Sequence, residues 1–193
     1  MALKVLTNAQ MREADRYTIE EKGVSSLVLM ERAGEALAKE SVFIAPSGNI
    51  LCVCGGGNNG GDGFVCALLL KAQGRAVDVV CIAEKLSQEC AYNQRKWQET
   101  GGACFLAIPQ KKYSLVVDCL FGTGFHGSLA GAEKSVAAQI NQMKKEGSKV
   151  LSADIPSGVN GRNGWGDSVA ICADVTLCIG EIKTGVLLND GID

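Results

Sequence analysis

The residues best suited to binding a ligand form the loop Gly55 to Gly63, in which six of nine positions are glycine. Glycine lets the backbone turn sharply and come close to a ligand, and a helix that follows such a loop points free N–H groups at an anion. The other loop residues, Asn58, Asn59 and Asp62, supply side-chain oxygens for a cation, a hydroxyl or an amide. A plain strand-to-helix turn needs fewer glycines. We therefore predict that this loop binds the phosphates of a nucleotide-like ligand.

Further polar residues follow the ends of other short apolar runs. Asp118 precedes a second glycine-rich segment, 122–128, and Asp154 precedes Ser157, while Lys183 follows the last apolar run. Carboxylates and a lysine beside a phosphate loop suit acid–base chemistry or metal binding. Each has a structural alternative, because such aspartates often cap helices or turns and such a lysine is often only solvated.

Classical nucleophiles find little support in the sequence. His126 is the only histidine, and no Gly-x-Ser-x-Gly segment supplies a serine nucleophile, so we favour loop structure or substrate contact for His126. Cys119 lies within an apolar run, where a core residue is the simpler interpretation than a nucleophile. The nine cysteines include no Cys-x-x-Cys pair, which predicts reduced and mostly buried thiols rather than a zinc site or disulfides.

The helices and strands that position these residues are predicted to form a parallel α/β fold. A capping box at Thr7 predicts a helix that ends near Gly23. A second helix is expected from 25 or 26 to 43, and one face of it should pack on a core through Leu27, Met30, Ala33, Ala36 and Leu37. Nearly continuous apolar strands indicate a sheet covered by helices on both faces. We expect strands at 50–54, 76–82, 103–106, 114–120, 149–154 and 174–179, and further helices at 61–73, 87–100 and 133–146.

This pattern predicts a three-layer, Rossmann-like α/β sandwich with a mainly parallel central sheet and two helices at its N-terminus. Ligands of such sheets bind beyond the carboxyl ends of the strands, where the polar residues named above fall. A length of 193 residues fits one domain over 1–193.

Charge and hydropathy narrow the class of partner. Nineteen basic against 21 acidic residues give a net charge of −2, which disfavours nucleic acid and anionic membranes and favours a small ligand. The N-terminus becomes polar too early for a signal peptide, and no apolar run approaches the roughly 20 residues of a spanning helix. We therefore expect a cytoplasmic protein.

The glycine spacing leaves a second enzyme class open. Gly55, Gly57 and Gly60 satisfy the dinucleotide-binding fingerprint, with Glu84 as a candidate ribose ligand, and this favours an NAD(P)-dependent oxidoreductase. Against it, Asn58, Asn59 and Asp62 place side-chain oxygens in a loop that usually offers only backbone donors to a pyrophosphate.

Across its whole length the chain resembles the YjeF N-terminal family, the NAD(P)H-hydrate epimerases. The resemblance rests on these segments: 6–11, 30–34, 55–63, 118–124, 154–158 and 183–185. It implies interconversion of the R and S epimers of NADHX and NADPHX, reduced cofactors damaged by hydration at C6 of the nicotinamide ring, as a metabolite repair reaction.

The resemblance also assigns site residues. It implies a bound potassium ion (K+) held by Asn59, Asp118 and Ser157. From the chemistry of this reaction we expect Asp118, Lys183 or both to be catalytic and to assist cleavage of the C–O bond and the return of water, with roles that could be exchanged. Asp118→Ala should then abolish activity without affecting the fold. The family resemblance also implies substrate contacts from Asn58, Asn59, Gly60, Gly61, Asp62, Gly122, Thr123, Gly124, Phe125, His126, Gly127, Ser128 and Asp154.

The chain ends at 191–193, where the family usually continues, so we expect either a trimmed domain or part of a longer protein. In bifunctional members an ADP- or ATP-dependent dehydratase domain follows; here the dehydratase is expected as a separate domain or protein. The helices before the sheet leave a homodimer possible. Some relatives are non-catalytic ligand-binding or dimerisation modules, but the site residues are all present here.

Overall fold

The chain forms a six-stranded sheet whose neighbouring strands are all parallel, as the computed structural model shows for residues 3–192. The spatial order is β4-β3-β2-β5-β6-β7. Its strands are β2 (Ile50–Cys54), β3 (Val77–Cys81), β4 (Cys104–Phe105), β5 (Leu115–Cys119), β6 (Lys149–Ala153) and β7 (Val175–Leu177). All six predicted strands are confirmed. Met1, Ala2 and Asp193, which enter the predictions about the domain and its two ends, lie outside the described residues.

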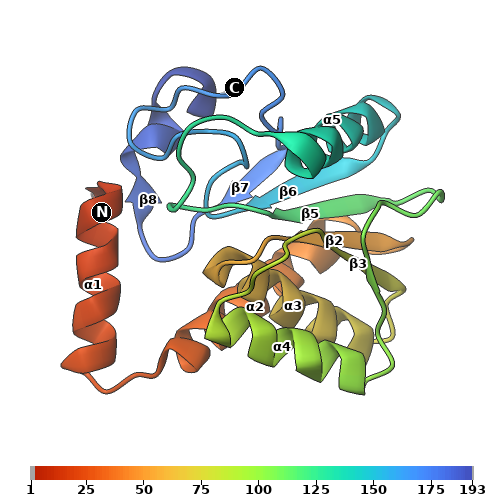
Figure 1. Cartoon of the computed structure of the whole chain (residues 1–193), viewed down its shortest axis with the longest axis horizontal. Helices are drawn as coiled ribbons and strands as arrows, with labels where there is room; N and C mark the ends of the chain where they lie inside the picture. Colours follow the sequence, from red (N-terminus) through yellow and green to blue (C-terminus); the bar gives the residue numbers. More distant parts are fainter. Residues whose placement is uncertain (1–2, 193) are drawn as a thin grey trace.

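Helices cover both faces of the sheet, which confirms the three-layer α/β prediction. In Figure 1, α2 (Ser26–Ile44), α3 (Asn58–Ala72) and α4 (Gln88–Glu99) lie below the sheet and α5 (Gly131–Lys145) lies above it. The strand residues alternate between the two cores. In β2, Ile50, Cys52 and Cys54 pack on the α3 side and Leu51 and Val53 on the α5 side.

The cysteines are free thiols that mostly belong to the core, as expected. Six of the nine are buried, and only Cys172 is exposed. Cys119 is fully buried within β5. Burial raises the pKa of its thiol well above the usual range, so it is a packing residue and not a nucleophile.

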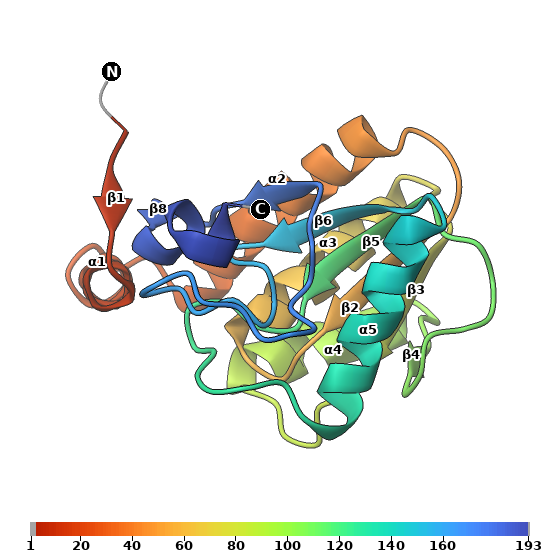
Figure 2. The ribbon, with the colours of Figure 1, turned by 90° about the horizontal axis from the view of Figure 1, so that it is seen from above.

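Helix α1 (Asn8–Glu20) stands apart from the sheet, as Figures 1 and 2 show. The predicted capping box is present: the Thr7 hydroxyl accepts from the Gln10 backbone N–H at 3.2 Å, and the Gln10 side chain accepts from the Thr7 N–H at 2.9 Å. A two-stranded parallel sheet that the sequence did not predict holds this end in place. It pairs β1 (Val5–Leu6) with β8 (Ile182–Lys183) and so sets the position of Lys183.

The glycine-rich loop is shorter than predicted, because α3 begins at Asn58 and not near Gly61. The glycines inside the helix allow close packing. A Cβ on Gly60 would collide with the Gly55 carbonyl oxygen, and one on Gly63 would lie 2.8 Å from Cys119 Cβ. The first turn of α3 therefore sits directly against the ends of β2 and β5.

Two smaller corrections concern α2 and the C-terminal region. Met30, Ala33 and Leu37 are buried on α2 as expected, whereas Leu27 and Ala36, predicted on the same face, are exposed. After β8 the chain continues in two short 3-10 helices at Thr184–Leu187 and Asn189–Gly191. Within residues 3–192, the helices are all too short or too polar to cross a membrane.

Candidate functional site

A cavity of about 770 Å³ lies between α1 and the carboxyl ends of the central strands. This is the topological switch point of the sheet, because the chain leaves β2 toward β3 on one side and later returns to add β5 on the other. Such crevices commonly hold ligands, and the volume falls in the usual range for small-molecule sites. The predicted location of the site is therefore matched by a cavity.

The structure brings eight of the predicted site residues together around this cavity. They are Asn58, Asn59, Asp62, Gly122, Thr123, Gly124, Asp154 and Lys183. They come from the start of α3, the loops that follow β5 and β6, and β8.

Other predicted residues do not line the cavity. Gly60 and Gly61 are buried by helix packing, and the Phe125 side chain belongs to the α5-side core, where it stacks on Phe121 at 5.3 Å between ring centroids. The exposed residues are His126, Gly127 and Ser128. Their roles as substrate contacts stay predictions.

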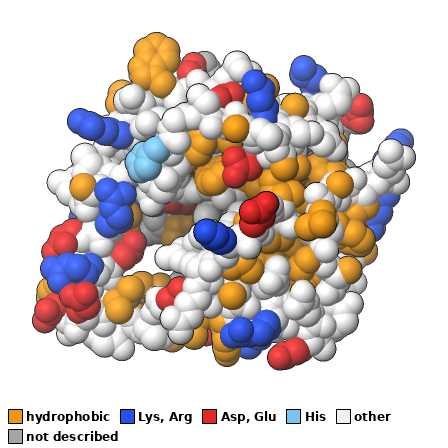
Figure 3. All heavy atoms as spheres, in the orientation of Figure 1, with side chains coloured by type: hydrophobic (Ala, Val, Ile, Leu, Met, Phe, Trp, Pro, Cys, Tyr) orange, Lys and Arg blue, Asp and Glu red, His pale blue; other side chains and the backbone are white. Residues whose placement is uncertain are grey.

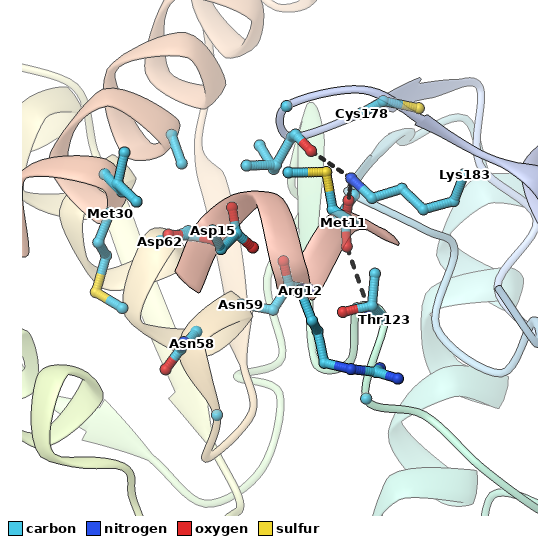
Figure 4. A pocket seen from close by; sticks show the side chains of 18 of the residues that line it. Met11, Arg12, Asp15, Met30, Asn58, Asn59, Asp62, Thr123, Cys178 and Lys183 are labelled. Atoms are coloured by element: carbon cyan, nitrogen blue, oxygen red, sulfur yellow. Dashed lines mark hydrogen bonds and ion pairs between the residues drawn. The ribbon is translucent and has the colours of Figure 1, made fainter. Parts of the chain in front are cut away.

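A buried ion pair forms one wall of the cavity. Lys183 Nζ contacts Asp154 Oδ1 and the carbonyl oxygen of Ile179, and the lysine is only 1% exposed. The second carboxylate oxygen of Asp154 accepts from Thr123 N at 3.2 Å (Figure 4). Asp154 has a φ of 69°, an unfavourable backbone conformation for a residue with a side chain. Such strain is concentrated at functional sites, and the pair can exchange a proton with a bound ligand.

Asp62 projects into the same cavity from the first turns of α3. It is 8% exposed, and its carboxylate has no hydrogen-bond or ion-pair partner among residues 3–192. Desolvation raises the pKa of Asp62 well above its usual range, and the nearby charges of Asp154 and Asp15 raise it further. This buried carboxyl is therefore available to bind a polar group of a ligand.

Asp62→Asn is expected to stabilise the folded protein at neutral pH by about 0.5–2 kcal/mol. A carboxyl whose pKa is raised by folding favours the folded state below its unfolded pKa and loses that contribution as the pH rises through the folded pKa. The advantage of asparagine should therefore grow with pH in urea unfolding measured from pH 5 to 8. Glu99→Gln, at an exposed carboxylate, is the matched control and should stay within about 0.5 kcal/mol of the parent. An advantage independent of pH would contradict the argument.

Asp118 lies beneath the cavity, fully buried, and is not among its lining residues. Its carboxylate accepts four hydrogen bonds: from Leu120 N at 3.2 Å, Ser152 Oγ at 2.8 Å, Ser157 N at 2.9 Å and Ser157 Oγ at 2.6 Å. Burial raises the pKa of the Asp118 carboxyl, although these donors oppose the rise. Asp118 thus ties the loop after β5 to the loop after β6, and the expectation that its removal leaves the fold intact is revised.

The three residues assigned to a cation supply only oxygen. Asn59 Oδ1 is buried without a hydrogen-bond partner among the described residues, which leaves it free to coordinate an ion. Asp118 brings negative charge, and the Ser157 hydroxyl links Asp118 to Phe121 N at 3.0 Å. Oxygen donors of this kind suit a hard cation. Within residues 3–192 there is no cluster of three His, Cys, Asp or Glu side chains suited to a transition metal.

The sequence did not point to the opposite wall of the cavity. Helix α1 supplies Met11, Arg12, Asp15 and Ile19, and α2 supplies residues that include Arg32. The spacing of the α1 residues places them on one helical face, and this periodicity was the only available signal. Because ordinary amphipathic helices show the same spacing, it does not distinguish a ligand-facing surface from a packed one.

The surface charge agrees with a small ligand. On the face seen in Figure 3, positive and negative side chains are interspersed and form no broad basic area. Glu84, the candidate ribose ligand of the oxidoreductase alternative, is exposed and does not line the cavity. The fold and the cavity together define a Rossmann-like α/β protein with a polar ligand site at the switch point of its sheet.

The chain belongs to the family described as YjeF-related protein N-terminus, whose family model matches residues 26–185. It is 35% identical to an NAD(P)H-hydrate epimerase of Limosilactobacillus fermentum, over 99% of this chain and 92% of that protein. It is 36% identical to a bifunctional NAD(P)H-hydrate repair enzyme Nnr of Thermofilum pendens, of which it covers 38%. The crystal structure of yeast YNL200c shares the fold, with a TM-score of 0.85, 21% identity and coverage of 97% of this chain and 85% of the yeast chain.

Proposed function

We propose that this chain interconverts the R and S epimers of hydrated NADH and NADPH, the activity named for its relatives. The observation that carries the proposal is the buried Asp154–Lys183 pair on the wall of a cavity that begins at the N-terminus of α3. It offers acid–base groups beside a phosphate-binding helix end.

The reaction requires proton transfer but no redox partner. The damaged C6 carries a hydroxyl beside the ring nitrogen, so the nitrogen lone pair assists departure of hydroxide and leaves a cationic ring. Water then adds to C6 from the other face. Lys183, held by Asp154, is suited to donate a proton to the departing oxygen. Asp118 has its oxygens occupied beneath the cavity, so in this mechanism it positions the loops and does not transfer the proton.

The start of α3 is suited to the phosphates. Its N-cap, Gly57, makes no side-chain capping bond, so the first N–H groups of the helix have no such partner. Gly57, Asn58 and Asn59 all line the cavity. An anion placed there is favoured by these donors and by the helix dipole.

The oxygen donors of Asn59, Asp118 and Ser157 fit the potassium ion that the family resemblance implies. Asn59 Oδ1 supports this part of the proposal, because it is buried and has no hydrogen-bond partner among residues 3–192. When bound, the ion would supply positive charge that attracts the ligand's phosphates. Asn59 also forms part of the cavity wall, which links the ion to the ligand site.

One incubation separates the proposed activity from its alternatives. Purified protein is given a single NADHX epimer in potassium buffer, and the R and S forms are separated by chromatography over time. We expect approach to the equilibrium mixture at least about 100-fold faster than without protein. A parallel incubation with NADH and carbonyl acceptors should show no NADH oxidation; oxidation there with no epimerisation would establish the oxidoreductase alternative. Tight binding of NADHX with no acceleration would indicate a binding module.

Two partner assignments accompany the proposal. Exposed apolar side chains of Tyr17, Leu27 and Val28 on α1 and the start of α2 support a homodimer formed through these helices. Bifunctional relatives such as the Thermofilum pendens protein join a second activity in one chain, which supports a dehydratase as the enzyme that uses the epimerised product.

A further inference from the structure

A third carboxylate, Asp15, faces the cavity from α1, the wall that stands across from the strand ends. In Figure 4 its side chain leaves α1 on the side of Asp62 and Asn59. It lies close enough for its charge to raise the pKa of Asp62. Asp15 therefore belongs to the same electrostatic environment as Asp154 and Lys183 but reaches it from a different element.

Asp15 lines the cavity and is exposed to solvent, so its carboxylate is available to a ligand. Among residues 3–192, no donor makes a hydrogen bond or ion pair with its carboxylate. Desolvation raises its pKa, the nearby positive charge of Lys183 opposes the rise, and Asp154 adds to it. The other charged groups around the cavity are Asp62 on α3, Arg12 on α1 and Arg32 on α2.

A second observation points to a ligand at this position. Asp62 is more than nine-tenths buried, projects into the cavity and has no partner in residues 3–192. Asp62 and Asp15 thus line one cavity from different helices, while the Lys183 ammonium is already held by Asp154. Buried polar groups normally find partners, so a bound polar molecule is expected beside Asp62.

Epimerisation requires groups that transfer protons on two walls of the cavity. Inversion at C6 requires hydroxide to leave from one face of the ring and water to add to the other. A group on one wall can reach only one face of a ring bound between the walls, and proton transfer requires hydrogen-bond distance. Asp154 follows β6 at the strand ends and holds Lys183, which comes from β8, so the ring face turned toward α1 needs a group on that helix.

We propose that Asp15 is a catalytic residue of this site: it serves the ring face turned toward α1, while the Asp154–Lys183 pair serves the face turned toward the sheet. The inference rests on the proposed epimerase function and deepens it. On this arrangement, α1 completes the active site and is more than a cover over it.

The protons and electrons balance within this scheme. For the epimer whose hydroxyl faces the sheet, the pair gives a proton to the oxygen as the C6–O bond breaks with its electrons on oxygen, and the nitrogen lone pair forms the N1=C6 bond. A water molecule then forms a bond to C6 from the α1 side, the N1=C6 electrons return to nitrogen, and Asp15 takes the proton from the water. The reverse direction exchanges the two roles, and solvent resets both groups.

Asp15→Asn in the full chain tests the proposal when the reaction is run in H₂¹⁸O. Inversion of NADHX should fall at least about 100-fold, the usual cost of losing a general acid or base. One epimer, whose hydroxyl faces the sheet, should still exchange that oxygen with solvent within about threefold of the parent rate, because its cleavage and its return on the same face need only Asp154 and Lys183. Oxygen exchange with retention is the signature that a merely structural role would not produce.

The controls separate this inference from the function on which it rests. Glu21→Gln makes the same charge change at an exposed residue at the end of α1 and should leave both rates unchanged. Asp15→Glu should recover part of the inversion. An equal fall of exchange and inversion in Asp15→Asn, or inversion within about threefold of the parent, would overturn the role of Asp15. Failure of the parent protein to invert NADHX would instead reject the proposed function.

Discussion

Lys183→Met is expected to reduce epimerisation about 10²- to 10⁴-fold, because it removes the cation that pairs with Asp154 while keeping a side chain of similar length. It should also lower the free energy of unfolding by about 3–5 kcal/mol, since the Asp154 carboxylate and the Ile179 carbonyl lose their partner in a buried position. Initial rates with single epimers and urea unfolding measure the two effects separately.

A double variant distinguishes catalysis from simple unfolding. Lys183→Met with Asp154→Asn removes both charges, so much of the lost stability should return while the activity stays low. Lys149→Met breaks an exposed pair with Asp174 at 3.2 Å and should cost no more than about 1 kcal/mol. Activity within threefold of the parent for a folded Lys183→Met protein would remove Lys183 from the mechanism.

The sequence was informative about this region because its main signals are local. Apolar runs located all six strands of the main sheet, and the residues that follow β2, β5 and β6 are polar in types that suit a ligand. The parallel topology then places these strand ends at one edge, so Asn59 and Asp154 could be assigned to one site before their positions were known.

What the sequence could not provide depends on contacts between distant segments. Pairing of β1 with β8 involves two residues on each side, too few for a periodic pattern, yet it brings Lys183 into the cavity wall. The same limit applies to Asp15, which reads as an ordinary polar helix residue until α1 is placed across from the strand ends. Asp118 shows the opposite case: its residue type suggested chemistry, while its depth and its four donors indicate a structural centre.

Asp118→Ala is expected to lower the free energy of unfolding by about 3–5 kcal/mol, because it leaves two backbone N–H groups and two serine hydroxyls without their acceptor in a buried place. Epimerase activity should fall with it, since the loops after β5 and β6 carry Thr123 and Asp154. Ser152→Ala is the graded control: it removes one donor and should cost about 1 kcal/mol. A fully stable Asp118→Ala protein without activity would return Asp118 to a direct catalytic role.

Potassium provides a second measurement on the same residues that does not depend on activity. An ion bound only by the folded state stabilises it by about 2.7 kcal/mol at a hundred times its dissociation constant, so the parent protein should melt at a higher temperature in potassium chloride than in N-methylglucamine chloride of equal ionic strength. Asp118→Ala should lose this difference. If the ion does not bind, salt identity should have no effect on the parent.

Asn59→Ala makes the ion prediction sharper because its two effects have opposite signs. Without potassium, the variant should be at least as stable as the parent, since Asn59 Oδ1 is a buried acceptor with no partner among residues 3–192 and its only hydrogen bond, from Nδ2 to Ala153 O, is long at 3.4 Å. With potassium, the parent should become the more stable of the two. A general packing defect would make the variant less stable than the parent in both salts. Only a coordinating role for Asn59 reverses the order of stability of the two proteins when potassium is added.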